Sequence, residues 1–488
     1  MTDRRPARPE GGIVRTVPEL LVACARRRAD AVVLVEEERS LTGARLLDLA
    51  QRGAGLLRRR GVAAGEFVAV DARSLGWVDV AVAYFSVTWL GAAAVIVDSP
   101  PGPGRDLLGA RRMVTAGAAG GMEAIAPAEL WDAEPATLPP AARPNAVLDV
   151  VYTAGTTGVP KPVLSTQLQW TTTLRTEMLA ARTARAIGHR GVPVSVSGGV
   201  HGILLSHLAR GATSICARAT GDFLAAAAAW GARELHLEPH AARELLRSAA
   251  AFEPAWAAAV RTVRIVGGPL PAALGSSLVD AFPSARVISF YGLTEAGAAQ
   301  CMKVFDPARP DSIGRPLPGT ELRVVGQEGE PVPRGQVGEL MVRSVGIRPP
   351  RYHGNEALNA ASFDGEWVRT GDLGFVAEDN EVRLVGRSKE LLILKGGRIA
   401  PHLVEDILAR SLPGDLDFAV VGVATDHAWD EIAVCIADSP DREKVAASLA
   451  ALDRMRGPFR PTLVRVVPRI PRGVSGKPLR RQLAEELT

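Results

Sequence analysis

A stretch rich in hydroxyls and glycines, VVYTAGTTGVPKPV at residues 150–163, has the residue types of a loop that holds an anion. Its glycines allow backbone N–H groups to converge on a negative charge, and a lysine adds a point charge that suits phosphate. The stretch lacks the GxxxxGK[ST] pattern of a Walker A loop. It predicts a phosphate-binding loop of another kind, with the polar side chains Thr153, Thr156, Thr157 and Lys161.

Two later stretches each combine a turn with side chains suited to part of a nucleotide. ISFYGLTEAG at residues 288–297 ends a strand-like run in a ring, a hydroxyl and a carboxylate, which suit a base, a phosphate and Mg²⁺. In WVRTGDLG at residues 367–374, the carboxylate of Asp372 could accept both hydroxyls of a ribose. Taken singly, each stretch also fits a plain turn with a solvated or turn-capping carboxylate.

Two more stretches, GRSKELLILKGGRIAP at residues 386–401 and GVSGKPLRR at residues 473–481, complete a series of five. Alone, Lys477 in the last stretch fits a solvated basic tail. Together, in this order, the five stretches resemble the adenylate-forming superfamily of acyl-CoA synthetases, adenylation domains and luciferases. The resemblance covers nearly the whole chain. The GRSKEL and GGRIAP forms look more like an acyl- or aryl-CoA ligase than an amino-acid adenylation domain.

The resemblance implies a two-step reaction. ATP and a carboxylate give an acyl-AMP and pyrophosphate, and a thiol then displaces AMP. That thiol is usually coenzyme A or the pantetheine of a carrier protein. The implied cofactors are ATP, Mg²⁺ and coenzyme A. Because the first step is an in-line attack on phosphorus, catalysis consists mostly of positioning and charge stabilisation.

The resemblance also implies a role for each matching residue. Lys477 would bridge the carboxylate and the α-phosphate, Thr294 would meet the α-phosphate, and Glu295 would bind Mg²⁺. Lys389 matches the hinge about which a C-terminal domain swings between the two steps, and Gly397 would line the path of the thiol. The residues that would bind ATP are Thr153, Thr156, Thr157, Lys161, Gly267, Gly268, Tyr291, Asp372 and Arg387.

The chain departs from the family pattern in its loop. Ala154 stands where the family usually has Ser or Thr, Pro162 where it has Gly, and Gln167 where many relatives have His. Since one hydrogen bond to a charged group is worth about 1.5–3 kcal/mol, losing one hydroxyl weakens ATP binding by about ten- to a hundredfold at most. The remaining threonines predict a working loop.

A second departure lies in PVSVSGGVHGILLSHL at residues 193–208, where relatives show a PxFH pattern. His201 either contacts a polar substrate or packs at the start of a helix, because leucines follow it at helical spacing. Phe290 stands where some aryl-CoA ligases have Gly, which favours an aryl or short acid over a long fatty acid. The candidate residues of the acid pocket are Ser197, Gly199, His201, Phe290 and Gly292.

Three functions remain open on these residues. The first is an acid–CoA ligase of secondary or catabolic metabolism. The second is an adenylating enzyme of natural-product biosynthesis whose acceptor is a carrier protein, a nitrogen nucleophile or nitrite. The third is a non-catalytic nucleotide-binding homologue, against which Lys477, Glu295 and Asp372 argue. A metal site at HLEPH, residues 236–240, lacks the HExxH spacing and is not expected.

More than one domain must hold these stretches, since 488 residues exceed one ordinary domain. Helix-like and strand-like runs alternate in the first half, short alternating strands follow Gly314, and helices and strands mix in the last hundred residues. We therefore predict an α/β multidomain fold. Residues 1–387 form an adenylation core of layered α/β subdomains plus a small β-barrel, and residues 388–488 form a mobile α+β domain with the catalytic lysine.

Composition excludes several other classes of protein. The formal net charge is +4, with basic residues spread along the chain, so no nucleic-acid partner is expected. The four cysteines lie far apart, which fits a reducing cytoplasm and excludes a zinc signature. Residues 81–97 are the most apolar stretch, but a buried helix followed by a buried strand explains them better than a membrane span. We expect a cytoplasmic protein that binds a small carboxylic acid.

Overall fold

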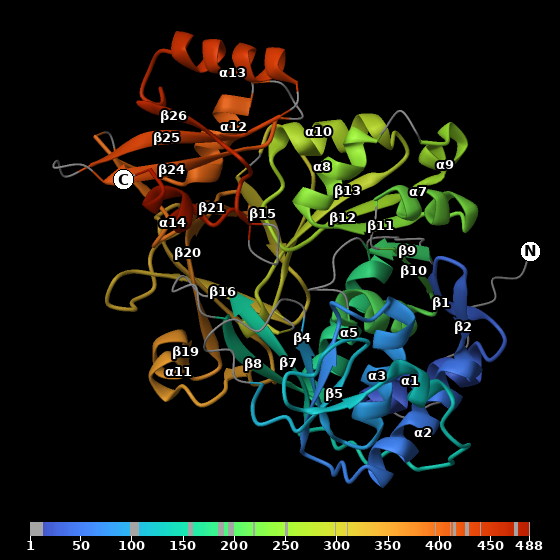
Figure 1. Ribbon diagram of the computed structural model, residues 1–488. Helices are drawn as coiled ribbons and strands as arrows, with labels where there is room; N and C mark the ends of the chain where they lie inside the picture. The colour runs from blue at the N-terminus through green and yellow to red at the C-terminus, as the bar shows by residue number, and fades with distance from the viewer. Residues whose placement is uncertain are drawn as a thin grey trace, which may run out of the picture.

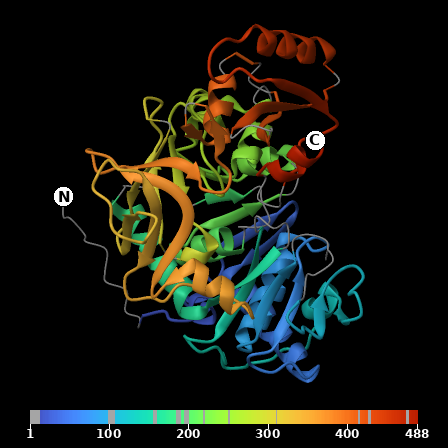
Figure 2. The ribbon, with the colours of Figure 1, turned by 90° about the vertical axis from the view of Figure 1, so that its left-hand side faces the viewer.

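The computed structural model is shown as a ribbon in Figures 1 and 2. It describes residues 13–97, 107–154, 160–183, 190–193, 200–217, 220–248, 252–297, 299–309, 311–395, 397–409, 411–412, 416–424, 429–439, 441–472 and 477–487. The chain folds into two large sheets, with a short two-stranded ribbon and a three-stranded sheet toward the C-terminus. This arrangement confirms the predicted α/β multidomain fold.

The first sheet has seven strands. In order across the sheet they are β18 (Arg351–Tyr352), β8 (Pro160–Thr166), β7 (Val147–Ala154), β4 (Ala93–Val97), β3 (Phe67–Asp71), β5 (Arg112–Val114) and β6 (Glu123–Ile125). Strands β7, β4, β3, β5 and β6 run parallel, whereas β7 and β8 form an antiparallel hairpin. The residues that connect β7 to β8 belong to the predicted phosphate loop and lie outside the described residues.

A bundle of helices shares one large core with this sheet. They are α1 (Val17–Arg27), α2 (Gly43–Arg59), α3 (Trp77–Trp89), α4 (Pro127–Trp131), α5 (Gln167–Thr183), η1 (Val200–Leu205) and α6 (Ser206–Arg210). Helix α3 is apolar on nearly every side, so it is buried along its length, and the strand β4 that follows it is buried too. These two elements confirm the buried helix and strand expected for residues 81–97.

The second sheet begins as a mostly parallel sheet. Its strands in this part are β2 (Arg39–Thr42), β1 (Val32–Glu36), β10 (Thr213–Cys216), β9 (Arg190–Pro193), β11 (Glu234–Leu237), β12 (Thr262–Ile265) and β13 (Arg286–Tyr291). Apolar residues of one sheet face pack against α7 (Thr220–Ala229), α8 (Pro239–Arg247), α9 (Pro254–Ala259) and α10 (Ala272–Ala281). The other face of β11 and β12 bears charged side chains.

The same sheet continues beyond β13 as antiparallel strands that form a half-barrel, and the strands that follow Gly314 are those expected there. These strands are β14 (Cys301–Val304), β15 (Ser312–Pro316), β21 (Val382–Arg387), β20 (Trp367–Val376), β17 (Gly338–Ser344) and β16 (Thr320–Val325), with the short β19 (Phe363–Asp364) beside β20. The short helices η3 (Thr294–Ala296) and α11 (Glu356–Ser362) belong to this region.

The C-terminal residues form a unit with its own apolar clusters. Its elements are β22 (Leu392–Leu394), β23 (Gly397–Ile399), α12 (Pro401–Ala409), β24 (Phe418–Ala424), β25 (Asp430–Ala437), α13 (Arg442–Arg454), β26 (Leu463–Val467) and α14 (Arg480–Glu485). It lies beside α10 of the larger part, which α12 contacts (Figure 1). Strand β21 ends at Arg387, and the domain boundary after that residue stays a prediction.

The fold brings several predicted motifs together at the edge of the second sheet where its parallel strands end. Parallel strands β12 and β13 point their carboxyl ends toward the loops that hold Gly267 and Thr294, where ligands of open α/β sheets commonly bind. The half-barrel brings β20 to the same place, and the C-terminal unit brings Lys477. Within the described residues, no helix is long and apolar enough to cross a lipid bilayer.

Candidate active site

The centre of the site is the buried carboxylate of Asp372 on β20, whose residue is 4% exposed. Its Oδ2 accepts a hydrogen bond from the hydroxyl of Tyr291 at 2.7 Å, and its Oδ1 accepts one from Nε of Arg387 at 3.1 Å. The register of the antiparallel strands β20 and β21 sets Asp372 opposite Arg387. Three residues predicted from separate motifs are therefore in direct contact.

The electrostatics of this group keep each member in one protonation state. Burial raises the pKa of the Tyr291 phenol well above its ordinary value, and the negative charge of Asp372 raises it further. Burial is the largest single influence on Arg387 and lowers its pKa, but the negative charges of Asp372, Glu390 and Glu295 act together in the other direction, so the net shift is upward. Tyr291 therefore stays a neutral donor and Arg387 a cation at physiological pH.

Lys477 reaches this centre from the C-terminal unit. Its Cε lies 4.0 Å from the position that a Cβ on Gly268 would occupy. Lys477 keeps an exposed face, yet the protein around its ammonium group lowers its pKa by desolvation, and the positive charge of Arg387 acts in the same direction. Carboxylates, among them that of Asp372, oppose the shift. Lys477 thus brings a side chain of the C-terminal unit close to Gly268 and the Asp372–Arg387 pair.

The loop after β12, which contains Gly267 and Gly268, lies next to Lys477. Gly267 has a φ of +80°, a left-handed conformation that favours glycine. A Cβ at Gly267 would lie 3.4 Å from Cγ of Glu238, and one at Gly268 would lie 3.2 Å from Cγ of Pro239. The two predicted glycines therefore allow the end of β11 and the loop after β12 to approach each other beside the lysine.

Tyr352, which lies outside the predicted motifs, hydrogen-bonds Glu295, the residue predicted to bind Mg²⁺. The hydroxyl of Tyr352 on β18 donates to Oε1 of Glu295 at 2.6 Å and also hydrogen-bonds the side chain of Thr153. Burial and the charge of Glu295 raise the pKa of Tyr352, so it remains a donor. Tyr352 lies outside the five predicted stretches, so no motif marks it.

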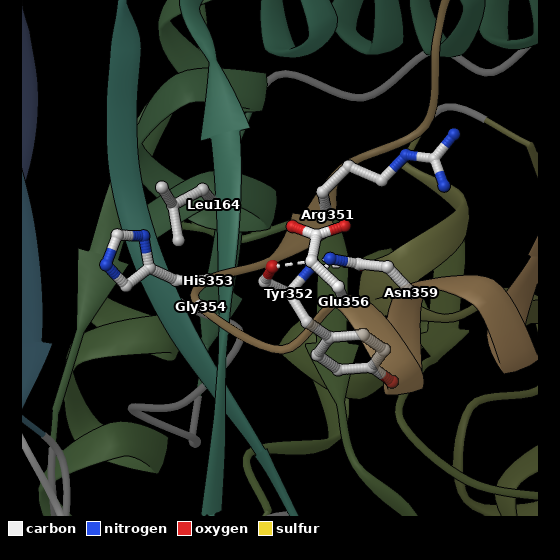
Figure 3. Close-up of a pocket in the computed structure, with 7 residues that line it drawn as sticks. All are labelled: Leu164, Arg351, Tyr352, His353, Gly354, Glu356 and Asn359. Carbon is white, nitrogen blue, oxygen red and sulfur yellow. Dashed lines mark hydrogen bonds between the residues drawn. The ribbon is translucent and has the colours of Figure 1, made fainter.

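A surface cavity of about 380 Å³ lies beside Tyr352 (Figure 3), and one of its lining residues holds the Tyr352 backbone. Asn359 accepts from the N–H of Tyr352 at 3.0 Å and donates to its carbonyl at 2.9 Å. In Figure 3 the Tyr352 ring points away from the Asn359 side chain. The cavity is lined by Leu164, Arg351, Tyr352, His353, Gly354, Glu356 and Asn359, none of which the sequence predicted as a site residue.

The predicted phosphate loop is described only at its base. Thr153 on β7 lies directly opposite Lys161 on β8 in the antiparallel register. Thr156 and Thr157 lie outside the described residues, as do Ser197 and Gly199 of the predicted acid pocket. Thr294 begins η3, directly before Glu295, and is partly exposed. The roles of these residues stay predictions.

His201 has the contacts of a packed histidine. It is 8% exposed, and its ring stacks on that of Trp170 with centroids 3.8 Å apart. Its Nε2 contacts Oδ2 of the fully buried Asp149, which also accepts from the Tyr84 hydroxyl at 2.7 Å. The structure thus favours the packing role over the substrate contact, and the place of His201 in an acid pocket stays a prediction.

The other two candidates of the acid pocket lie beside the Asp372 group. Phe290 precedes Tyr291 on β13, is partly exposed, and has the guanidinium of Arg264 over its ring at 5.2 Å from the centroid. Gly292 follows that strand and is exposed. Phe290 therefore lies between Tyr291 in the chain and the charged face of β12, and the acid-pocket roles of both residues stay predictions.

The predicted hinge and thiol-channel residues stand apart from this centre. Lys389 is exposed in the turn after β21, where the N–H of Glu390 donates to the carbonyl of Arg387. Gly397 begins β23 with a φ of +133°, and open space surrounds the position of its missing Cβ. The roles of Lys389 and Gly397 stay predictions.

The described residues contain no group of three or more His, Cys, Asp or Glu side chains that could hold a metal by themselves. Glu295 offers a single carboxylate near Thr153 of the loop. Mg²⁺ in nucleotide sites takes one or two carboxylates and completes its shell with phosphates and water, so this donor set fits it. His236 pairs with Glu234 at 2.6 Å, which accounts for that histidine without a metal.

Comparisons with known proteins show the family and the fold. A family model described as "AMP-binding enzyme" matches residues 110–349. A sulfoacetate–CoA ligase of Cupriavidus necator is 32% identical over 405 residues, which cover 81% of this chain and 77% of that protein. A solved anthranilate–CoA ligase in complex with anthranoyl-AMP superposes with a TM-score of 0.81 at 21% identity, over 98% of each chain.

An O-succinylbenzoate–CoA synthetase of Bacillus subtilis, solved in complex with ATP and magnesium ion, also shares the fold. It superposes with a TM-score of 0.78 at 21% identity and covers 95% of this chain and 98% of its own. At these identities the solved structures establish the common fold.

Proposed function

Because this chain belongs to the AMP-binding enzyme family, as an AMP-forming acid–CoA ligase, we propose that it activates a small carboxylic acid, aryl or short in chain, and transfers the acyl group to coenzyme A. The observation that supports this most is the position of Lys477. It comes from the C-terminal unit, yet it lies beside Gly268 and close to the Asp372–Arg387 pair.

The carboxylate of Asp372 can accept further hydrogen bonds, and these would come from a ribose. Each of its oxygens accepts one protein hydrogen bond, from Tyr291 or from Arg387, and a carboxylate oxygen has a second lone pair. Both ribose hydroxyls can therefore donate to a carboxylate that is already oriented. The Tyr291 ring, fixed through its hydroxyl, offers an apolar face for the base.

Lys477 and Thr294 would act on the reacting centre. An oxygen of the acid attacks the α-phosphorus, the bond to the pyrophosphate oxygen breaks, and pyrophosphate leaves with its electron pair. Negative charge on the α-phosphoryl oxygens has to be balanced as this happens. Lys477 supplies a cation close to Gly268, where the acid and the α-phosphate would meet.

Glu295, Tyr352 and Thr153 would hold the triphosphate end. Mg²⁺, when bound, neutralises phosphate charge and helps pyrophosphate to leave. Tyr352 ties Glu295 to Thr153 at the base of the loop, so the metal-binding carboxylate keeps a fixed position relative to the phosphate donors. Lys161 lies opposite Thr153 on the neighbouring strand and would add its positive charge there.

The transfer step needs a second arrangement of the C-terminal residues. We propose that residues 388–488 swing about Lys389, which removes Lys477 and brings Gly397 to the thiol. The exposed turn at Lys389 and the open space around Gly397 support this proposal. The names of the related proteins, which refer to sulfoacetate and anthranilate, support a small acid.

The test is pyrophosphate release with MgATP across aryl, cinnamyl, short-chain and amino acids, each with and without coenzyme A. We expect release with one class of small acid, and a marked rise when coenzyme A is present. Release that ignores coenzyme A but rises with a carrier protein or nitrite would overturn the proposed acceptor. Faster turnover of palmitate than of benzoates and short acids would overturn the proposed acid class.

A further inference from the structure

Two ion pairs of the C-terminal unit flank Lys477 in the chain. Before it, Arg472 pairs with Asp417 at 2.5 Å. After it, Arg480 donates to both carboxylate oxygens of Glu405, at 2.8 and 2.9 Å. The two carboxylates belong to different segments, since Glu405 lies in α12 and Asp417 directly precedes β24. The ion pairs therefore tie the residues on both sides of Lys477 to the body of the C-terminal unit.

Backbone contacts also join the residues before Lys477 to those after it. Arg472 and Pro478 form an antiparallel bridge, and the N–H of Leu479 donates to the carbonyl of Pro471 at 2.8 Å. The backbone next to Lys477 therefore keeps a fixed place relative to the two ion pairs. Where the C-terminal unit lies then decides where the lysine lies.

Helix α8 of the larger part begins beside Lys477. Cγ of Pro239, the first residue of α8, lies 3.2 Å from the position that a Cβ on Gly268 would occupy, and Cε of Lys477 lies 4.0 Å from the same position. The carboxylate of Glu238, directly before the helix, attracts Lys477 electrostatically. Helix α10 contacts both α8 and α12. The start of α8 and the C-terminal unit are therefore neighbours at the reacting centre.

One turn into α8, the side chain of Arg243 interacts with both ion pairs. The charges that act on it include those of Arg472, Glu405 and Asp417. His240 lies three residues earlier on the same face of the helix, and the charges of Arg472 and Asp417 act on it as well. Two residues of α8 thus place this face of the helix against the ion pairs that flank the lysine.

The carboxylates of the C-terminal unit attract Arg243, but only in part. Burial lowers the pKa of Arg243, and the positive charge of Arg472 acts in the same direction. The carboxylates of Glu405, Asp417 and Asp406 oppose this shift, yet the net shift is downward. The attraction therefore offsets only part of the cost of taking the guanidinium out of water. Charge pairing of this kind across an interface selects one orientation more than it adds affinity.

We propose that Arg243 is a positioning residue for adenylate formation, which orients the C-terminal unit so that Lys477 reaches the reacting centre. This inference rests on the proposed role of Lys477. Arg243 acts through the carboxylates Glu405, Asp406 and Asp417 of the unit that carries the lysine. An oriented contact of low affinity suits a unit that has to leave before coenzyme A reaches the acyl-adenylate.

The test measures the two half-reactions separately. Single-turnover pyrophosphate release with MgATP and a reactive acid reports adenylate formation, and thioester formation from supplied acyl-adenylate and coenzyme A reports transfer. Arg243→Glu places a carboxylate against three others, which disfavours the arrangement that brings Lys477 to its place. We expect pyrophosphate release to slow by about tenfold or more. Thioester formation, which does not use this arrangement, should not slow.

The matched control is Arg233→Glu. Arg233 is an exposed arginine directly before β11, at the opposite end of that strand from α8. This variant should leave the ratio of the two rates unchanged. If Arg243→Glu slows both half-reactions by the same factor, or slows neither, the positioning role is overturned, because a loss of overall structure would not select one half-reaction.

A charge reversal on the other side of the contact gives an independent test. Asp406 of α12 belongs to neither of the two ion pairs, and Asp406→Arg should produce the same selective loss of pyrophosphate release. In the double variant the reversed charges attract each other, so the loss should be smaller than the product of the two single losses. A loss equal to that product would overturn the contact. If Arg243→Glu does not fold, the selectivity of the loss in Asp406→Arg decides.

The outcomes separate this inference from the proposed function. If the unaltered enzyme completes both half-reactions and neither reversal changes their ratio, the inference fails while the proposed function stands. If no acid releases pyrophosphate with the unaltered enzyme, both fail.

Discussion

Two carboxylates are each paired with arginine side chains, Asp372 with Arg387 and Glu234 with Arg210 and Arg264. The two groups, called here the open group and the closed group, differ in their access to solvent. Beside Asp372, the side chain of Arg387 is 40% exposed. Beside Glu234, the side chains of Arg210 and Arg264 are each only 9% exposed. The first group is open to solvent on one side, whereas the second is closed. We therefore expect substitutions in the first group to affect substrate binding and substitutions in the second group to affect stability.

The largest effect that distinguishes the two groups should be on stability. Glu234→Gln leaves two buried arginines without their carboxylate, and breaking a buried ion pair costs about 3–5 kcal/mol. We expect a loss of this size in the free energy of unfolding by urea. Asp372→Asn, which removes the charge from the open group, is the comparison variant and should lose less. Equal losses in the two variants would remove the distinction.

The closed group should also make stability depend on pH. The pKa of His236 falls from 6.5 in the unfolded chain to about 4 in the folded protein, so between these values the unfolded state binds more protons. This contribution is present above pH 6.5 and is lost as pH falls toward 4, by about 1.4 kcal/mol per unit. Denaturant titrations should show this slope, and His236→Gln should reduce it by about one proton. An unchanged slope would contradict the neutral, buried histidine.

The open group should affect ATP rather than folding. In Asp372→Asn one acceptor oxygen becomes an amide, so one ribose hydroxyl loses its charged partner at about 1.5–3 kcal/mol. We expect KM for ATP to rise by about 10- to 100-fold while KM for the acid changes little. Steady-state kinetics with each substrate varied in turn measures this. A rise confined to KM for the acid would contradict the ribose role.

The smallest effect should follow the loss of a single hydroxyl at the edge of the open group. Tyr352→Phe removes the hydrogen bond to Glu295 but keeps the ring, and a typical bond contributes about 0.5–1.5 kcal/mol. We expect a loss of up to about tenfold in kcat/KM for MgATP, with a higher Mg²⁺ requirement. The control is Tyr84→Phe, because Tyr84 bonds Asp149 away from Glu295. An equal change in Mg²⁺ requirement in both variants would contradict a positioning role for Tyr352.

The sequence predicted the open group well because its residues belong to ordered motifs. Tyr291, Asp372 and Arg387 come from three stretches, and their contacts follow from the register of β20 and β21 together with the end of β13. The α/β multidomain fold and the buried stretch at residues 81–97 were predictable from alternation and hydrophobicity. In each case local pattern and tertiary contact agree.

The closed group could not be predicted from the sequence, because its residues belong to no local motif. His236 drew attention only as part of HLEPH, and Glu234, Arg210 and Arg264 come from different elements that meet only when β11 and β12 pair and α6 covers them. Tyr352 was missed for the same reason. His201, for which both a substrate contact and a packed helix start were open, stacks on Trp170, and leucines at helical spacing pack the following residues into the core that the first sheet shares with its helices.

The central claim is that Lys477, supplied by the C-terminal unit, drives acyl-adenylate formation. The most direct measurement is the single-turnover rate of pyrophosphate release from MgATP and a reactive acid in Lys477→Ala, beside Lys395→Ala as an exposed lysine of the same unit. Removing a charge stabiliser from the transition state predicts a fall of about 10²- to 10³-fold in Lys477→Ala alone. A rate of pyrophosphate release that is unchanged in Lys477→Ala would contradict the account.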